Sequence, residues 1–357
     1  MILDIVKVLL PATLGFFVGM GITPTIANYL YRNKMWKKTV KSVAVDGHAT
    51  PVFSALHKDR EINTPRLGGM VIWLSAFIVG SLIWILAKFL PFEVFTKIEF
   101  ISRNQTWIPF ATLLIGAFVG FIDDILEIKG NGGHIAGGLS LKKRLLAVGA
   151  IGLIIGSWFF FKLDVVSIGI PFYGDLFIGW LIIPLFITVL MAIYSGGVID
   201  GIDGLAGGVF TIMFAAYGLI AFYLDLIDLA AFSALLVGSI LAFLWYNIPP
   251  ARFYMSETGS MALTVTLGVV AFMTDSLGGG FGILLLLIIG MPLVITTGSV
   301  IINVSSKKLR NGKKVFLSTP IHHHFEALGW PPYKVTMRYW VGSVIFAALG
   351  VIIALIG

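Results

Sequence analysis

Ten stretches of this chain are apolar for about 20 residues, the length that an α-helix needs to cross the hydrocarbon core of a bilayer. Only 12% of the residues are charged, about half the share found in soluble proteins. The sequence therefore predicts an all-α, polytopic integral membrane protein, with residues 1–357 forming one domain. The expected transmembrane helices cover residues 5–31, 68–90, 107–123, 143–161, 176–195, 205–223, 229–246, 259–275, 281–303 and 338–356.

The positive charges indicate how these helices are oriented. If the N-terminus lies outside the cell, five loops face the cytoplasm and contain 20 of the 25 lysines and arginines. Cytoplasmic loops carry such an excess, so both termini are expected to be extracytoplasmic. The same bias accounts for the net charge of +7 without a nucleic-acid partner. The expected inner loops are 32–67, 124–144, 196–204, 247–258 and 304–338.

One outward-facing loop has a pattern of its own. In LDVVSIGIPFYGDL, residues 163–176, β-branched residues surround Gly and Pro. This pattern fits a small β-hairpin and an irregular loop equally well.

Five carboxylates gather at the cytoplasmic boundary of the expected helices. Asp123 and Asp124 end the third span, Asp200 and Asp203 lie in SGGVIDGIDGLAGG, and Glu257 lies in FYMSETGSMAL. Charges near lipid are costly, and adjacent Asp residues repel each other unless a cation or proton lies between them. Mg²⁺ prefers carboxylate oxygens together with substrate phosphates. The pattern therefore indicates a Mg²⁺ site, in a chain whose lack of cysteine excludes a thiolate metal site.

Simpler roles are open for each residue taken alone. An isolated Asp at a helix end is most often a cap or a solvated residue, and DGIDG alone could be a turn. The run His322, His323 and His324 holds half of the six histidines, and it could be a metal site, an anion site or an incidental cluster. Acids from three loops at one boundary favour a functional site. A cation-coupled transporter, the alternative from another class, is expected to place its acids near midspan.

Five motifs of the inner loops resemble those of the polyprenyl-phosphate N-acetylhexosamine-1-phosphate transferases, over nearly the whole chain. Within this family, the HHHFE run points to the branch that handles muramoyl-pentapeptide. The motifs are TPRLGG (64–69), DD (123–124) with GLSLKKR (138–144), DGIDGLAGG (200–208), WYNIPPARFYMSETGS (245–260) and TPIHHHFEALG (319–329).

This resemblance implies transfer of phospho-N-acetylmuramoyl-pentapeptide from its UDP carrier to undecaprenyl phosphate, giving lipid I and UMP for peptidoglycan. It implies Mg²⁺ as cofactor and the bacterial cytoplasmic membrane as location, and it is compatible with a homodimer. The nearest alternative is a GlcNAc-1-phosphate transferase for teichoic acid or O-antigen. The lipid phosphate could attack directly, or an Asp could attack first to give a phosphoryl-enzyme. Direct attack is favoured because a phosphate monoester is a competent nucleophile.

The resemblance and the chemistry of phosphoryl transfer together assign roles to the motif residues. The expected catalytic residues are Asp123, Asp124, Asp203 and His322. The expected substrate-binding residues are Arg144, Asp200, Gly201, Asn247, Tyr254 and His323. The expected Mg²⁺ ligands are Asp123, Asp124 and Glu257.

The three histidines are expected to differ, because successive residues cannot all face one site. His322 is expected to contact phosphate or a metal-bound oxygen, and His323 the sugar of the nucleoside. His324 is expected to pack or cap its own loop, with Glu326 as a partner.

The chain also departs from the family pattern. Ser256 and Glu257 stand where Gly-Asp is usual, and Gly197 replaces an amide that could touch substrate. Glu61 and Glu127 each replace a customary lysine. These changes leave the reaction class intact and bear on the identity of the sugar nucleotide.

Overall fold

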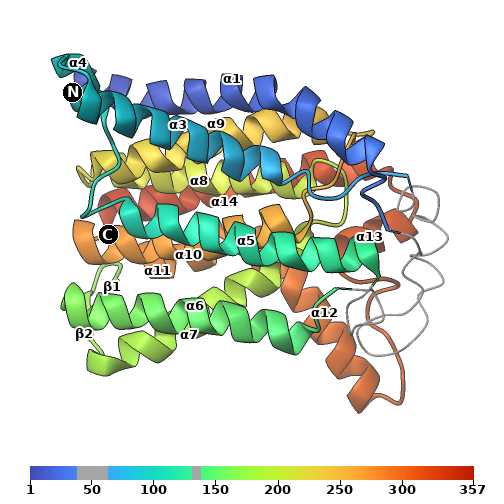
Figure 1. Ribbon diagram of the computed structural model, residues 1–357. Helices are drawn as coiled ribbons and strands as arrows, with labels where there is room; N and C mark the ends of the chain where they lie inside the picture. Colours follow the sequence, from blue (N-terminus) through green and yellow to red (C-terminus); the bar gives the residue numbers. More distant parts are fainter. Residues whose placement is uncertain (38–62, 131–137) are drawn as a thin grey trace.

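The computed structural model describes residues 1–37, 63–130 and 138–357. Within these ranges the chain is a bundle of long helices with one small sheet (Figure 1). Two 3-10 helices, η1 (Gly179–Leu181) and η2 (Gly197–Ile199), flank α7. The α-helices are α1 Ile2–Arg32, α3 Met70–Phe89, α4 Glu93–Ile98, α5 Trp107–Lys129, α6 Leu141–Lys162, α7 Ile182–Gly196, α8 Leu205–Tyr223, α9 Ile227–Asn247, α10 Ser256–Gly278, α11 Gly282–Ile289, α12 Met291–Leu309, α13 Ile321–Ala327 and α14 Pro332–Ile356.

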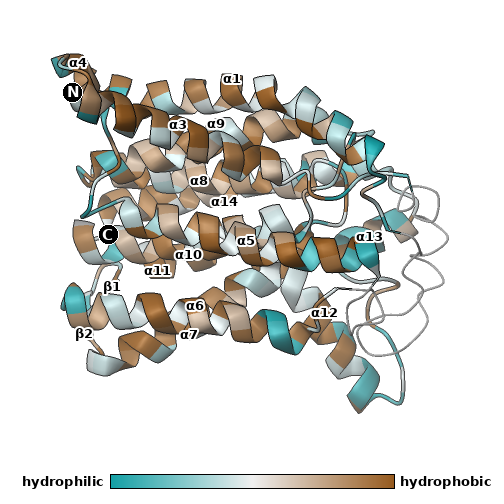
Figure 2. Cartoon of the chain, viewed as in Figure 1, coloured by the Kyte–Doolittle hydropathy of each residue, from teal (hydrophilic) through white to brown (hydrophobic). Residues whose placement is uncertain are grey.

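Nine helices of the described residues are long and apolar enough to cross a membrane, and the bent pair α11 and α12 gives a tenth span if it counts as one. Figure 2 shows apolar residues along the bodies of the helices and polar residues gathered toward one end of the bundle. The expectation of about ten transmembrane helices is confirmed at this level.

The span expected at residues 281–303 is not one straight helix. α11 and α12 are bent by 67° at a break around Gly290. Pro292 stands in the first turn of α12, the position where its missing N–H is tolerated and its fixed φ suits a new helix start. A side chain at Gly290 would collide with the carbonyl of Leu286. α12 therefore leaves the bundle obliquely (Figure 1).

α10 lies at the centre of the bundle. In its apolar segment 89% of the residues are buried, against 17% for α1 and α14 at the periphery. Helices in membranes associate through close packing at small residues. Gly120 of α5 is one of these, because a Cβ there would overlap the backbone of Glu257. This crossing sets the end of α5 against the beginning of α10.

The loop that begins at residue 163 forms a hairpin, one of the two structures that its sequence allows. β1 (Ser167–Ile170) pairs antiparallel with β2 (Gly174–Phe177). Asp275 of α10 anchors it by accepting the N–H of Gly169 at 3.0 Å. The hairpin and both chain termini lie at one end of the bundle, and α13 lies at the other (Figure 1).

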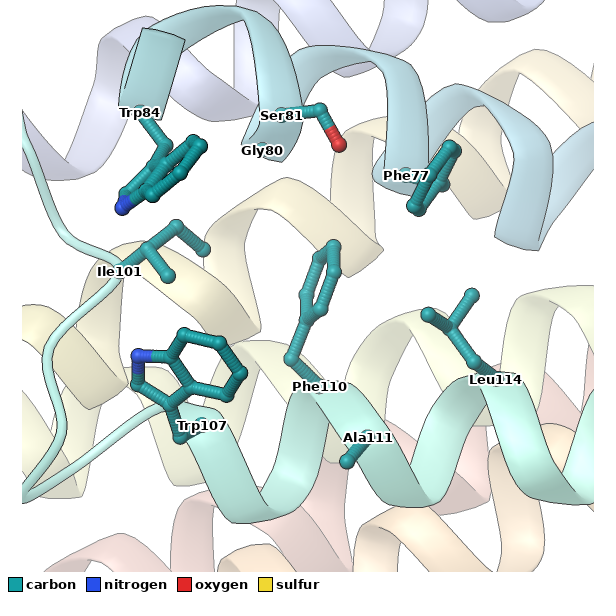
Figure 3. Close-up of a pocket in the computed structure, with 9 residues that line it drawn as sticks. All are labelled: Phe77, Gly80, Ser81, Trp84, Ile101, Trp107, Phe110, Ala111 and Leu114. Carbon is teal, nitrogen blue, oxygen red and sulfur yellow. The ribbon is translucent and has the colours of Figure 1, made fainter. Parts of the chain in front are cut away.

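An open apolar slot lies between α3 and α5, in the half of the bundle nearer the termini (Figure 3). Its volume is about 270 Å³, and its walls include Phe77, Trp84, Trp107 and Phe110. It is lined by none of the motif acids or histidines, so it is separate from the site at the opposite end.

Candidate active site

A partly buried arginine joins two of the expected site carboxylates. Arg144, in the first turn of α6, places Nη1 2.5 Å from Oε1 of Glu257 and Nε 3.3 Å from Oδ2 of Asp123. Asp123 is fully buried, and its Oδ1 accepts the N–H of Leu139 at 2.5 Å. Tyr194 donates to Oε2 of Glu257 at 3.4 Å. Asp123 and Glu257 thus share the guanidinium of Arg144.

Asp124 caps the N-terminus of α10 from the neighbouring helix. Its Oδ1 accepts the N–H of Glu257 at 3.2 Å, and its Oδ2 accepts the N–H of Thr258 at 2.9 Å. The first N–H groups of a helix have no partner within the helix, and a negative charge is favourable there. Asp124 therefore fixes the position of Glu257. Its expected role as a Mg²⁺ ligand stays a prediction.

Glu127 is paired with two basic side chains. Its Oε1 lies 2.9 Å from Nζ of Lys37, and its Oε2 lies 2.8 Å from Nη2 of Arg66. Arg66 also approaches Asp124, at 3.7 Å. No role for Lys37 or Arg66 was evident from sequence, although Arg66 stands in TPRLGG, because ion pairs between distant segments leave no local pattern. Glu127, which replaces a lysine customary in the family, is therefore neutralised by Lys37 and Arg66.

Two carboxylates hold the DGIDG loop, which connects η2 to α8. Oδ2 of Asp200 accepts the N–H of Ser256 at 2.9 Å, and Oδ2 of Asp203 accepts the N–H of Ala251 at 3.0 Å. Burial raises the pKa of Asp200 to about 6, against the opposing effect of the hydrogen bond from Ser256. Ser256 directly precedes Glu257, which shares Arg144 with Asp123. The hydrogen bond to Asp200 therefore links the DGIDG loop to these two carboxylates.

Asn247 and Tyr254 connect backbone segments at the same end of the bundle. The amide of Asn247 accepts the N–H of Gly204 at 3.0 Å and donates to the carbonyl of Phe253 at 2.8 Å. The backbone of Tyr254 is hydrogen-bonded to residues 65–68, and its ring is half-buried. The oxygen and the nitrogen of the Asn247 amide thus both have partners within the protein. These two hydrogen bonds position Gly204 and Phe253, and the sequence did not reveal them.

His322 and His323 pack against the DGIDG loop. A Cβ on Gly201 would lie 2.5 Å from Nε2 of His322 and 2.9 Å from Nε2 of His323. Both histidines are buried, and their ring centroids are 4.3 Å apart. Nδ1 of His323 lies 2.6 Å from Oε2 of Glu326. Two motifs far apart in the sequence therefore share one wall of the site.

His324 stands apart from the other two histidines. Its Nδ1 accepts the N–H of Leu317 at 3.2 Å, and its ring meets Phe316 edge-on at 5.5 Å. These are the packing and capping contacts expected of it. Glu326, expected beside His324, instead pairs with His323, because residues three apart share a face of a helix.

Two departures from the family pattern can be compared with their local structure. Ser256 has a φ of 58°, in the left-handed region that favours the usual glycine. A Cβ on Gly197 would lie 2.6 Å from Oγ of Ser260, so a side chain fits there only if that hydroxyl moves. Glu61 lies outside the described residues.

The acid cluster fits a Mg²⁺ ion that takes only part of its ligands from protein. Within residues 1–37, 63–130 and 138–357, no three acid or histidine side chains form a ready-made metal site. Mg²⁺ is usually held by one or two carboxylates, with substrate phosphates and water completing the shell. Oδ2 of Asp123 is buried and accepts no hydrogen bond from the described part of the chain, and Glu257 lies across Arg144 from it. These two carboxylates suit that kind of site.

Comparison with known proteins decides the family. The model of Glycosyl transferase family 4 matches residues 106–275, which contain Asp123, Asp124, Asp200, Asp203 and Glu257. The phospho-N-acetylmuramoyl-pentapeptide-transferase of Listeria innocua is 34% identical over 280 residues, covering 78% of this chain and 83% of the relative. This chain belongs to the phospho-N-acetylmuramoyl-pentapeptide-transferase family.

Other members of this family match over almost their whole length. The transferase of the same name from Latilactobacillus sakei is 32% identical and that from Geobacillus thermodenitrificans 29%; each alignment covers 97% of this chain, and 98% and 97% of the respective relative. The chain is thus a multi-pass membrane glycosyl-1-phosphate transferase with bacterial relatives. The resemblance drawn from the five motifs is confirmed.

Proposed function

We propose that the protein transfers phospho-N-acetylmuramoyl-pentapeptide from its UDP carrier to undecaprenyl phosphate in the bacterial cytoplasmic membrane. An oxygen of the lipid phosphate attacks the β-phosphorus of the UDP-sugar. The bond from that phosphorus to the oxygen of UMP breaks, and UMP leaves. The products are UMP and lipid I, in which a diphosphate joins sugar and lipid.

One observation supports this reaction above the others. The DD motif, Glu257, DGIDG and the histidines form a continuous series of contacts at one end of the helices. A lipid phosphate and a soluble nucleotide can meet only at such a membrane boundary. A transporter is disfavoured, because its acids are expected near midspan.

The contacts suggest a role for each part of the site. Arg144 neutralises two carboxylates and can bind diphosphate oxygens as these develop charge. Asp200 and Gly201 form the wall for the uridine end, with the half-buried ring of Tyr254 available to stack on uracil. His322 contacts a phosphate oxygen, and His323, oriented by Glu326, contacts the nucleoside sugar.

The remaining acids divide into groups that contact substrate and groups that position others. Asp123 and Glu257 would hold Mg²⁺, which when bound neutralises phosphate oxygens in the transition state. Asp124 positions Glu257 through the first turn of α10. Asp203 accepts a backbone N–H of the adjacent loop and keeps Asp200 and Gly201 in place.

The choice of sugar nucleotide can be tested by release of UMP from detergent-solubilised protein. We expect release from UDP-N-acetylmuramoyl-pentapeptide when undecaprenyl phosphate is present, and none when either substrate is omitted. UDP-GlcNAc should give no release under the same conditions. Equal release from UDP-GlcNAc would assign the chain to GlcNAc-1-phosphate transfer instead.

The orientation, with both termini outside, can be tested by cysteine labelling, because the native chain has no cysteine. A cysteine replacing Tyr173, 80% exposed in the hairpin turn, should react with an impermeant thiol reagent in intact cells. A cysteine replacing Lys313, exposed at the opposite end of the bundle, should react only after the cells are opened. The reverse pattern would place the site outside the cell and contradict the proposed function.

A further inference from the structure

The segment where α12 ends is a compact, basic projection. We call residues 305–317 the α12 tip. Five of the eight residues from 307 to 314 are basic: Lys307, Lys308, Arg310, Lys313 and Lys314. No acid occurs between Asp275 and Glu326 in the sequence. The tip therefore carries a concentrated positive charge with no acid of its own.

The backbone of the tip is held in a defined shape. The chain reverses at Gly312, whose φ of 86° suits glycine. Ser306 donates from Oγ to the carbonyl of Lys313 at 2.9 Å. Oδ1 of Asn303 accepts the N–H of Val315 at 2.9 Å and of Phe316 at 3.2 Å. The segment after Gly312 is thus hydrogen-bonded to α12, so the backbone that carries the basic side chains has a fixed conformation.

Large apolar side chains are exposed among these charges. Leu309 is 82% exposed, and Val315 and Leu317 are about half exposed. In water such exposure brings no benefit. At a membrane surface, apolar side chains enter the headgroup boundary while basic groups remain among the phosphates. Because α12 leaves the bundle obliquely (Figure 1), its tip is displaced sideways from the other helices.

We propose that the α12 tip docks on the headgroups of anionic lipids at the membrane surface. Four to eight basic residues at the end of a membrane helix suit such lipids. A role in solubility alone would explain the charges but not the interleaved apolar residues. The ligand chemistry is the phosphate of a lipid headgroup, and the lipid is its source because the apolar residues need an apolar partner. The inference rests on the membrane setting and does not depend on the proposed reaction.

The docking can be measured with a dye on the tip. Val315→Cys gives a single labelling site at an exposed position, and the hydrogen bond from Val315 to Asn303 is made by its backbone N–H, which cysteine keeps. The dye-labelled protein is placed in nanodiscs of phosphatidylcholine, with or without phosphatidylglycerol, that carry a nitroxide on a lipid chain. We expect stronger quenching of the dye when phosphatidylglycerol is present. The difference should disappear in high salt, because the Debye length falls to about 3 Å at 1 M.

Two triple variants separate the tip from charge in general. Lys308→Gln, Lys313→Gln and Lys314→Gln should remove the effect of phosphatidylglycerol, since each basic group near an anionic surface strengthens attraction roughly fivefold. The control variant carries Lys129→Gln, Lys142→Gln and Lys143→Gln. These lysines are exposed near the ends of α5 and α6, at the same end of the bundle, and their loss should leave the effect intact.

Three results would overturn the proposal. Equal quenching in the two lipid mixtures would show no preference for anionic lipid. An equal loss of the effect in the control variant would assign it to net charge. Loss of quenching on addition of inorganic phosphate at matched ionic strength would make soluble phosphate the ligand. None of these readouts depends on turnover, so they stand apart from the test of UMP release.

Discussion

Replacing Asp123 with asparagine should lower kcat at least about 100-fold, because a bound metal contributes several kcal/mol of transition-state stabilisation. The substitution keeps the size of the side chain, and its carbonyl can still accept the N–H of Leu139. It removes the negative charge of Oδ2, the buried oxygen that accepts no hydrogen bond from any described residue. The charge of Arg144 remains paired with Glu257, so the fold should persist.

The measurement is kcat for UMP release, together with the melting temperature of each protein. EDTA should abolish the activity of the unmodified enzyme, and Mg²⁺ should restore it. Asp228→Asn is the control: Asp228, like Asp123, is an aspartate in an ion pair, 2.6 Å from Lys7 near the other end of the bundle, but it is partly exposed where Asp123 is fully buried. Its kcat should stay near that of the unmodified enzyme. Full activity of Asp123→Asn, or of the unmodified enzyme in EDTA, would remove the basis for a metal at Asp123.

Gly201→Ala should also lower kcat by about 100-fold, the loss that a displacement near 1 Å of site groups can cause. A Cβ at this position would lie within 3 Å of the Nε2 atoms of both His322 and His323. The backbone of Gly201 does not have a positive φ, so alanine brings no conformational strain of its own. The two rings must therefore move away from the loop.

The control for this variant is Gly342→Ala on α14, where an added Cβ meets nothing within 4 Å. We expect the control to retain its kcat. Gly201→Ala should melt close to the unmodified protein, because the clash involves two histidine rings at the end of the bundle and none of the large apolar side chains. Normal turnover of Gly201→Ala would show that the histidines do not need their present position for the reaction.

Much of the architecture could be predicted from hydropathy, because apolar segments of a given length must span the membrane. The break at Gly290 could not, because hydropathy reports contact with lipid and carries no information about the direction of a helix. The hairpin at 167–177 was left open by its sequence, since a short loop with Gly and Pro fits a strand pair or a turn equally well. Its pairing depends on Asp275, which is distant in the chain.

The site was predictable to the extent that its residues occur in motifs. The acids at 123, 124, 200, 203 and 257 and two of the histidines lie at one end of the bundle, linked through Arg144, backbone N–H groups and Gly201. What sequence could not give is the set of partners that orient them. Tyr194 and Lys37 stand in no motif, and their contacts with Glu257 and Glu127 join segments far apart in the chain. An aspartate that caps a helix also cannot be told from a metal ligand by sequence alone. Asp124, expected to bind Mg²⁺, accepts two N–H groups at the start of α10.

The ion pair between Lys37 and Glu127 has a consequence for how this family varies. Both side chains are nearly buried, so exchanging either one alone leaves two like charges in contact, which is costly away from water. Exchanging both reverses the pair and keeps it neutral. The two positions should therefore covary among relatives, with an acid near position 37 accompanying a lysine at 127. Arg66 also contacts Glu127, at 2.8 Å, and would face a lysine at 127 with Asp124 as its remaining partner, so position 66 should vary together with the other two.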